Sequence, residues 1–258
     1  MNPHAKLIFY TSLLLGTTIT ISSNHWAMAW AGLEINTLAA IPLISKSHHP
    51  RAVEASIKYF LVQASASAIL LLSSTMNAWL TGQWDITQLT HPTSCLLLTT
   101  AIAMKLGLVP FHFWFPEVLQ GSSMTTALLL STMMKFPPIT ILFLTSNSLN
   151  PMLMATMAIA SAALGGWMGL NQTQLRKVLA FSSIAHLGWM ALIIMYNPKL
   201  TLMTFYLYTT MTTTIFLTLN TTKTTKLSTM MTSWTKTPTL NAALMLTLLS
   251  LAGLPPLT

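Results

Sequence analysis

The sequence predicts an all-α polytopic membrane protein, and its composition and its apolar pattern both support this fold class. Of the 258 residues, 53% are hydrophobic and 6% are charged, whereas a water-soluble domain carries about a quarter charged residues. The mean hydropathy is +0.62. Apolar runs of about 20 residues, the length needed to cross roughly 30 Å of hydrocarbon, recur along the whole chain.

About nine transmembrane helices are expected, because polar or helix-breaking residues such as Pro50, Asp85 and Pro151 separate the apolar runs. The first run resembles a signal peptide, but no small-residue cleavage site follows it, so we interpret it as a retained helix. Together the runs predict a single transmembrane domain over residues 1–258. The expected spans are about 4–21, 25–44, 56–78, 94–110, 123–144, 149–170, 174–194, 199–220 and 240 to beyond 258.

The charge distribution predicts the orientation of these spans. A net charge of +8 could indicate a nucleic-acid-binding protein, but the lysines and arginines are scattered through short connections and form no basic face. We therefore expect the chain to contact membrane lipids and not to bind nucleic acid. If the connections alternate between the two sides of the membrane, one side receives nine basic residues and the other only Lys199. This bias predicts that the amino terminus faces the matrix or cytoplasm.

Three charged residues fall within spans and near the bilayer midplane: Glu34, Lys105 and Lys135. An ionised group at that depth costs roughly 2.5 to 3.5 kcal/mol, so three of them require a function or mutual compensation. Burial in a medium of low dielectric constant lowers the pKa of a lysine and raises that of a glutamate, and such a pair can act as a proton switch. The alternative is a buried ion pair that only locks helices together.

The segment after Lys105 predicts a broken helix. Gly107 and Pro110 follow it within about one turn and remove helical support, which exposes backbone groups at membrane depth. Gly253-Leu254-Pro255-Pro256 repeats the pattern five spans later, in a helix of opposite direction. Paired broken helices of opposite direction are typical of inverted-repeat transporters, in which they mark the ion path.

Two histidines are candidates for a proton path, because imidazole can pass protons through a wet interior. His112 follows the predicted break, and His186 lies in a span together with Ser182 and Ser183. The alternative for His112 is an interfacial histidine beside aromatic side chains, and for His186 a polar contact between helices. The single cysteine, Cys95, leaves too few thiolates for a zinc or iron-sulfur site, so we expect no metal or redox cofactor to be ligated by this chain.

Four segments make the chain resemble the antiporter-like core membrane subunits of mitochondrial complex I, over its whole length. They are GLEINTLAAIPL, AMKLGLVPFHFWFPEVLQG, the lysine before Phe-Pro-Pro, and LRKVLAFSSIAHLGWM. The resemblance implies an antiporter-like helix bundle with inverted repeats and discontinuous helices. It also implies that Glu34 is the family's membrane glutamate, Lys105 the lysine of the first broken helix, and Lys135 the lysine that links two half-channels.

The resemblance implies a subunit of the H⁺-translocating NADH:ubiquinone reductase, located in the mitochondrial inner membrane with its amino terminus on the matrix side. Quinone reduction elsewhere would drive proton translocation, with NADH, FMN, iron-sulfur clusters and ubiquinone all bound by other subunits and none by this chain. The implied partners are other membrane-arm subunits, neighbouring antiporter-like subunits among them. Because family members continue past LPPLT, the chain is expected to be truncated within its second broken helix.

Three other functions stay open from the sequence. A stand-alone cation/proton antiporter of related fold would differ from a respiratory subunit only in the family segments. A purely structural scaffold would tolerate apolar residues at the midplane charges. Reduction of a quinone by the chain itself is disfavoured, because the sequence offers no ligands for a redox centre.

Overall fold

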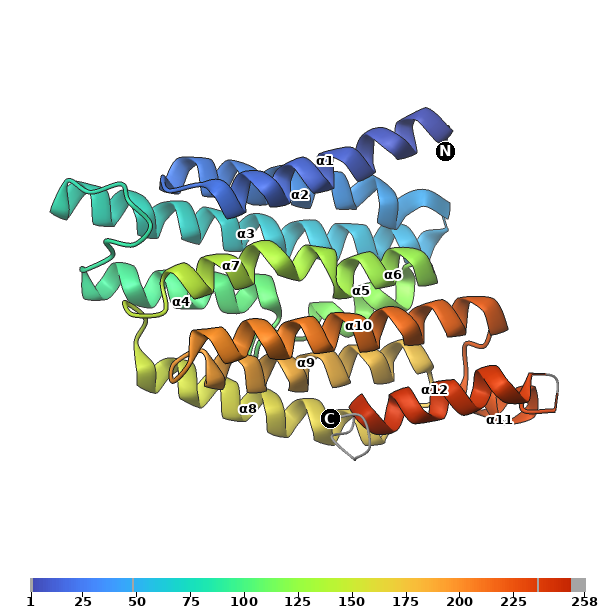
Figure 1. Cartoon of the computed structure of the whole chain (residues 1–258). Coiled ribbons are helices and arrows are strands. Elements are labelled where there is room, and N and C mark those ends of the chain that lie inside the picture. The colour runs from blue at the N-terminus through green and yellow to red at the C-terminus, as the bar shows by residue number, and fades with distance from the viewer. Residues whose placement is uncertain (1, 48, 236, 252–258) are drawn as a thin grey trace.

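The computed structural model describes residues 2–47, 49–235 and 237–251. Within these ranges the chain is a bundle of helices that run side by side, and it holds no β-sheet (Figure 1). The two isolated β-bridges, His25 to Asp85 and Gln174 to Lys226, join connections at the ends of helices. The predicted all-α fold class is therefore confirmed.

The helices follow the predicted spans closely. Six segments are long and apolar enough to cross a membrane: α1, α2, α3, the segment 124–144, α8 and α10. The three other predicted spans correspond to α4, α9 and α12. The elements are α1 (Pro3–Ser22), α2 (Trp26–Ile44), η1 (Ser45–Ser47), α3 (Pro50–Thr81), α4 (Pro92–Leu106), α5 (Trp114–Gly121), α6 (Met124–Ser131), η2 (Met133–Lys135), α7 (Phe136–Leu144), α8 (Pro151–Leu170), α9 (Leu175–Ile193), α10 (Pro198–Thr222), α11 (Leu227–Ser233) and α12 (Pro238–Leu251).

Prolines set where many of the helices begin. A proline is the first residue of α1, α3, α4, α8, α10 and α12. This position suits proline, because its fixed φ is already helical and the N–H that it lacks would have no partner in the first turn. At two of these starts an asparagine side chain caps the free amides, Asn150 before α8 and Asn197 before α10.

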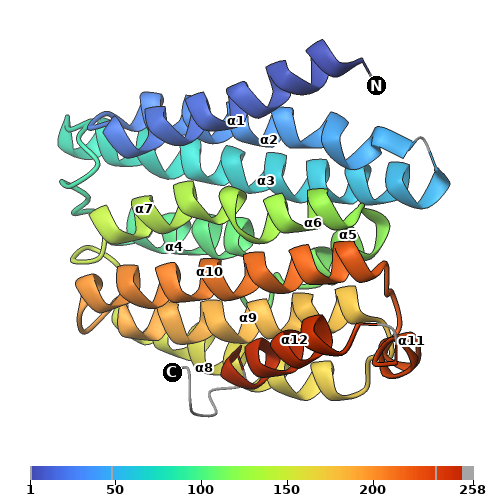
Figure 2. The same cartoon turned by 45° about the vertical axis from the view of Figure 1, so that its right-hand side comes forward.

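Close backbone approach fixes two helix pairs. Between α1 and α2, a Cβ at Gly16 would lie 2.8 Å from the Gly32 carbonyl oxygen. Between α8 and α9, a Cβ at Gly188 would lie 2.8 Å from the Ala158 carbonyl oxygen. Small residues permit such approach, and in a membrane the resulting van der Waals contact is a main source of helix association. Figure 2 shows α1 and α2 at one edge of the bundle, with α8 and α9 farther across it beyond α10.

The span that carries Lys105 is interrupted where the sequence predicts. Helix α4 ends at Leu106, and Gly107 adopts the left-handed conformation with φ of 76°. The chain then turns and resumes as α5, a helix of eight residues over a stretch that was expected to connect two spans. The predicted break is confirmed. The second Gly-Leu-Pro-Pro segment, at 253–256, lies outside the described residues.

The predicted span 123–144 is confirmed as an apolar segment long enough to cross a membrane, Met124–Leu144. It consists of two helices lying end to end, α6 and α7, joined by the 3₁₀ turn η2 (Figure 1). Thr132 departs from helical geometry with φ of −112° and ψ of −77°. Pro137 and Pro138 open α7 and cannot donate hydrogen bonds back to the preceding turn, which explains why α6 does not continue into α7.

The conformation of Gly107 gives a stability prediction. Replacing Gly107 by alanine places a Cβ on a backbone with positive φ, and we expect a loss of about 1 to 2 kcal/mol of stability in thermal unfolding of the purified protein. The nearest atom to that Cβ would be 3.6 Å away, on Trp114, so the cost comes from the backbone rather than from a clash.

The matched control is Gly82→Ala. Gly82 has nearly the same φ, 72°, at the end of α3, with no atom within 4 Å of a built Cβ. Both variants should therefore lose a similar amount of stability. A destabilised Gly82→Ala beside an unaffected Gly107→Ala would mean that the backbone at 107 is not left-handed.

Candidate functional site

The first interruption leaves carbonyl groups at the end of α4 without their usual helical donors. In a continuous helix, the N–H of residue 110 would bond to the Leu106 carbonyl, but Pro110 has no N–H. The Ala103 carbonyl is satisfied, since it accepts from the amides of Gly107 and Leu108, both at 2.9 Å. The Met104 carbonyl accepts from the Trp114 indole N–H at 3.2 Å. The Leu106 carbonyl must therefore find its donor outside α4.

Lys135 supplies that donor from the second interruption. Its Nζ donates to the Leu106 carbonyl oxygen at 2.5 Å, so a side chain in η2 occupies the carboxyl end of the broken helix α4. The carboxyl end of a helix carries partial negative charge and attracts a cation. The same Nζ lies 4.0 Å from the ring centre of Phe115 and 5.8 Å from that of Trp114, both on α5. Lys135 is 1% exposed.

Lys105 lines the same cavity as Lys135 but has no such partner. It is 3% exposed, and its Nζ makes no hydrogen bond to the described part of the protein. Both lysines line one cavity of about 20 Å³ between α2, α3, α4, α5 and the η2–α7 turn. A cavity of this size holds about one water molecule. The two predicted midplane lysines thus line one small cavity.

Glu34 reaches this cavity only indirectly. It is partly exposed on α2, and its carboxylate accepts a hydrogen bond from the Thr37 hydroxyl at 2.9 Å. Thr37 in turn lines the lysine cavity. Among the described residues, the Glu34 carboxylate and the Lys105 amine form no ion pair within 4.0 Å. The close approach of Glu34 and Lys105 stays a prediction.

The two histidines lie apart from this cavity. His112 is 2% exposed in the turn between α4 and α5, with its ring 4.1 Å from that of Phe113 and no hydrogen-bond partner for either ring nitrogen among the described residues. His186 lies on α9 and lines a mostly apolar groove of about 310 Å³ against α10 and α12. In the described part of the chain, no group of three or more His, Cys, Asp or Glu side chains is placed to hold a metal ion.

Tyr208 on α10 connects the two regions, although no sequence motif singled it out. Its hydroxyl donates to the Ser131 carbonyl at 3.4 Å, and its ring lies 5.7 Å from that of His186. The Ser131 carbonyl is free because the amide of Lys135, four residues on, bonds to Thr132 instead. The sequence could have pointed to Tyr208, because a tyrosine within an apolar span has a hydroxyl that needs a hydrogen-bond partner when it is buried.

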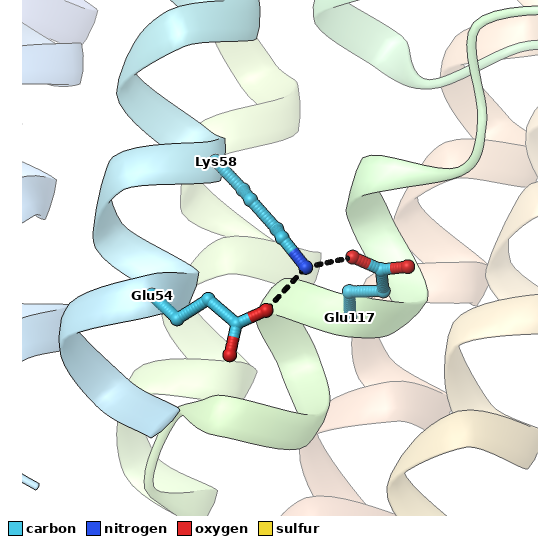
Figure 3. A network of polar contacts seen from close by, with 3 residues as sticks. All are labelled: Glu54, Lys58 and Glu117. Carbon is cyan, nitrogen blue, oxygen red and sulfur yellow. Dashed lines mark hydrogen bonds and ion pairs between the residues drawn. The ribbon is translucent and has the colours of Figure 1, made fainter. Parts of the chain in front are cut away.

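A second cluster of charged side chains lies near the start of α3 and joins it to α5. The Lys58 ammonium donates to Glu54 at 2.5 Å within α3 and to Glu117 on α5 at 2.7 Å (Figure 3). The Glu54 and Lys58 pair agrees with its helical spacing in sequence, whereas Glu117 could be matched only in three dimensions. The neighbouring Ser122 carbonyl accepts a hydrogen bond from the Arg176 guanidinium of α9. These contacts hold the second half of the broken span against α3 and α9.

Comparisons with known proteins identify the same architecture. Residues 23–258 match the family described as NADH:quinone oxidoreductase/Mrp antiporter, TM. The chain is 81% identical over all 258 residues to NADH-ubiquinone oxidoreductase chain 2 of Struthio camelus and 74% identical to that of Gallus gallus, and it covers 75% of each relative.

Solved structures agree with this match. A chain of respiratory complex I from Thermus thermophilus superposes with a TM-score of 0.90 at 28% identity, over 99% of this chain and 61% of that chain. A chain of the Mrp complex from Dietzia sp. DQ12-45-1b superposes with a TM-score of 0.84 at 19% identity, over 95% of this chain and 51% of that one. The second likeness concerns the fold alone.

The Tyr208 hydroxyl gives a prediction for this region. Tyr208→Phe removes the donor to a buried carbonyl, and because the hydrogen bond is long we expect the lower end of the usual cost, about 1 kcal/mol, in thermal unfolding. The control is Tyr206→Phe on the same helix, where the side chain is 68% exposed and no loss is expected. Equal stability of the two variants would argue against the Tyr208 to Ser131 hydrogen bond.

Proposed function

The chain belongs to the NADH:quinone oxidoreductase/Mrp antiporter family, and within it to the chain 2 subunits of NADH-ubiquinone oxidoreductase; on this basis we propose how its buried lysines move protons. It is a proton-translocating membrane subunit of respiratory complex I and a multi-pass protein of the mitochondrial inner membrane. It assembles with other membrane-arm subunits.

Lys105 and Lys135 are the proton carriers in this proposal, and their shared cavity is the observation that supports it. Each of these amines is costly to charge, because a buried site of low dielectric constant disfavours the ammonium form. Each lysine can therefore change its protonation state and take part in proton transfer. When the Lys105 ammonium gives a proton to a neutral Lys135 amine, the total charge of the two side chains does not change.

The surroundings of the two lysines differ in a way that gives the transfer a direction. The Leu106 carbonyl and the faces of Phe115 and Trp114 stabilise a charged Lys135. The Glu34 carboxylate, held by Thr37, is the candidate among the predicted site residues for an opposite charge that favours the charged form of Lys105. A change in the charge or position of Glu34 would then shift the proton between the lysines. We assign Glu34 the role of switch, acting across space rather than as a direct ion-pair partner.

The path beyond the lysines is proposed along two branches. His112, with both ring nitrogens unpartnered among the described residues, is assigned to the side of the first interruption. His186 is assigned to the other side, where Tyr208 lies between it and the end of α6 at Ser131. Imidazole and phenol groups can both pass protons, which makes this sequence of groups chemically competent.

The proposal also includes what drives the proton transfer, where the cofactors bind, and how the chain is oriented. Quinone reduction in other subunits drives the transfer, and NADH, FMN, the iron-sulfur clusters and ubiquinone bind there rather than to this chain. Neighbouring antiporter-like subunits are the direct partners. The amino terminus faces the matrix, since nine of the basic residues outside the midplane would then lie on the matrix side.

A structural lock is the main competing function for the midplane charges. Such a lock requires a direct ion pair, because separated charges in the membrane repay little of their desolvation cost. No ion pair joins Glu34 to either lysine in the part of the chain that the structure describes. This observation favours groups that change protonation state over groups that only fasten helices.

Lys105→Met tests the proposal. The methionine keeps most of the apolar stem but cannot titrate, so the enzyme should assemble while the proton-to-electron ratio falls. NADH-to-quinone turnover should drop about tenfold or more, because groups that transfer protons contribute roughly 10² to 10⁴ to rates. Lys105→Arg should impair both quantities too, since guanidinium stays charged.

The matched control is Lys199→Met, the same substitution at an exposed lysine at the start of α10. It should leave both quantities unchanged. An assembled Lys105→Met enzyme with normal turnover and an undiminished proton-to-electron ratio would refute the role of Lys105 and return the structural lock to first place.

A further inference from the structure

The ion pair between α3 and α5 lies outside the lysine cavity, but the helix that it holds forms part of the cavity wall. Lys58 of α3 donates to Glu117 of α5 at 2.7 Å (Figure 3). Trp114, at the start of α5, lines the cavity together with both lysines. Helix α5 has only eight residues, and its N-cap residue, Phe113, has no polar side-chain atom to cap the first turn. Contacts with neighbouring helices must therefore set how α5 lies.

One side of α5 faces α3. Trp114 and Glu117 are three residues apart, which places them within about 60° of each other around the helix axis. The ring centroid of Trp114 lies 5.8 Å from that of Tyr59 on α3. Glu117 pairs with Lys58, the residue just before Tyr59. Two consecutive residues of α3 thus contact the same side of α5 and fix its rotation about its own axis.

The opposite side of α5 carries Phe115, which contacts the amine of Lys135. Phe115 precedes Glu117 by two residues, or about 200° of helical rotation. It is 0% exposed, and its ring centroid lies 4.0 Å from the Lys135 Nζ. The attraction between an amine cation and a ring depends on the amine lying over the ring face. A rotation of α5 that draws Glu117 away from α3 would move the Phe115 ring across this amine.

We propose that Lys58 and Glu117 are positioning residues for Lys135, because their ion pair fixes the rotation of α5 and so holds the Phe115 ring against the Lys135 amine. The proposal rests on the proposed function of Lys135 as a proton carrier. Lys58 and Glu117 themselves line a separate, open cavity of about 340 Å³. They act on the buried amine only through α5.

Other contacts hold the end of α5 but leave this role to Glu117. A Cβ at Gly121 would lie 2.6 Å from the Arg51 carbonyl oxygen, so the last residue of α5 packs directly on the backbone of α3. The Ser122 carbonyl accepts from the Arg176 guanidinium. Both contacts lie about one turn beyond Glu117. They fix where α5 ends, so the loss of the ion pair should loosen α5 without unfolding it.

Two matched substitutions separate the pair between helices from the pair within one helix. The Lys58 ammonium bonds to both Glu54 and Glu117, but Glu54 lies on the same helix as Lys58. In the assembled enzyme, Glu117→Gln should raise the hydrogen-exchange rates of the α5 amides about two- to fivefold, the range expected for an exposed ion pair. It should lower the rate of proton translocation by a similar factor. The control Glu54→Gln should leave both quantities unchanged.

Ionic strength provides a readout that packing alone would not change. At about 1 M salt the screening length falls to about 3 Å, so an exposed ion pair is weakened. The exchange rates of α5 in the wild-type enzyme should therefore approach those of Glu117→Gln, whose own rates should change little. Lys58→Arg keeps the charge and several donors and should retain proton translocation, whereas Lys58→Met should behave like Glu117→Gln.

The positioning role and the proposed function fail under different outcomes. Normal proton translocation by Glu117→Gln would overturn the positioning role, even if α5 exchanges faster, because the pair would then hold α5 without affecting Lys135. Equal losses in Glu117→Gln and Glu54→Gln would overturn it as well. If Glu117→Gln does not assemble, unchanged α5 exchange of the wild-type enzyme at high salt would still refute the role. Normal proton translocation by Lys105→Met would instead remove the proposed function itself.

Discussion

The hydrogen bond from the Lys135 amine to the Leu106 carbonyl holds the lysine site together. It joins two helix interruptions that are 29 residues apart in sequence, and it brings the amine of η2 to the carboxyl end of α4. Without a donor at that carbonyl, the break after α4 would leave a buried acceptor unpaired, which is costly in a protein interior and more so in lipid. Lys135, which makes this contact, is also one of the residues that line the cavity.

The same constraint explains the other unusual contacts around the site. A break in a transmembrane helix is tolerated only where it lies inside protein and where other groups satisfy the freed backbone. Three side chains meet this need: the Trp114 indole bonds to Met104, Tyr208 to Ser131, and Lys135 to Leu106. Two of these three side chains, Trp114 and Lys135, also line the cavity that contains the titratable lysines.

The charges that are not at the midplane serve a different purpose. Lys58, Glu54 and Glu117 are exposed and screened, so they contribute little to stability as ion pairs. Their value is geometric, because Glu117 lies on α5 and Lys58 on α3 (Figure 3). Together with the hydrogen bond from Arg176 to Ser122, they orient a helix of only eight residues that a broken span would otherwise leave weakly held.

Local sequence features were enough to predict the fold class, most span positions and the first interruption, because apolar length, prolines at helix starts and the pair Gly107 and Pro110 act through the local backbone. Both lysines of the cavity were also predictable, since a charge within an apolar run is conspicuous. Three contacts required the folded chain: Lys135 meets Leu106, Asn36 rather than Glu34 lines the cavity, and Tyr208 reaches Ser131. These contacts depend on how each helix is rotated about its axis and on how deeply it lies against its neighbours. Packing between segments far apart in sequence sets both quantities, and no local pattern records them.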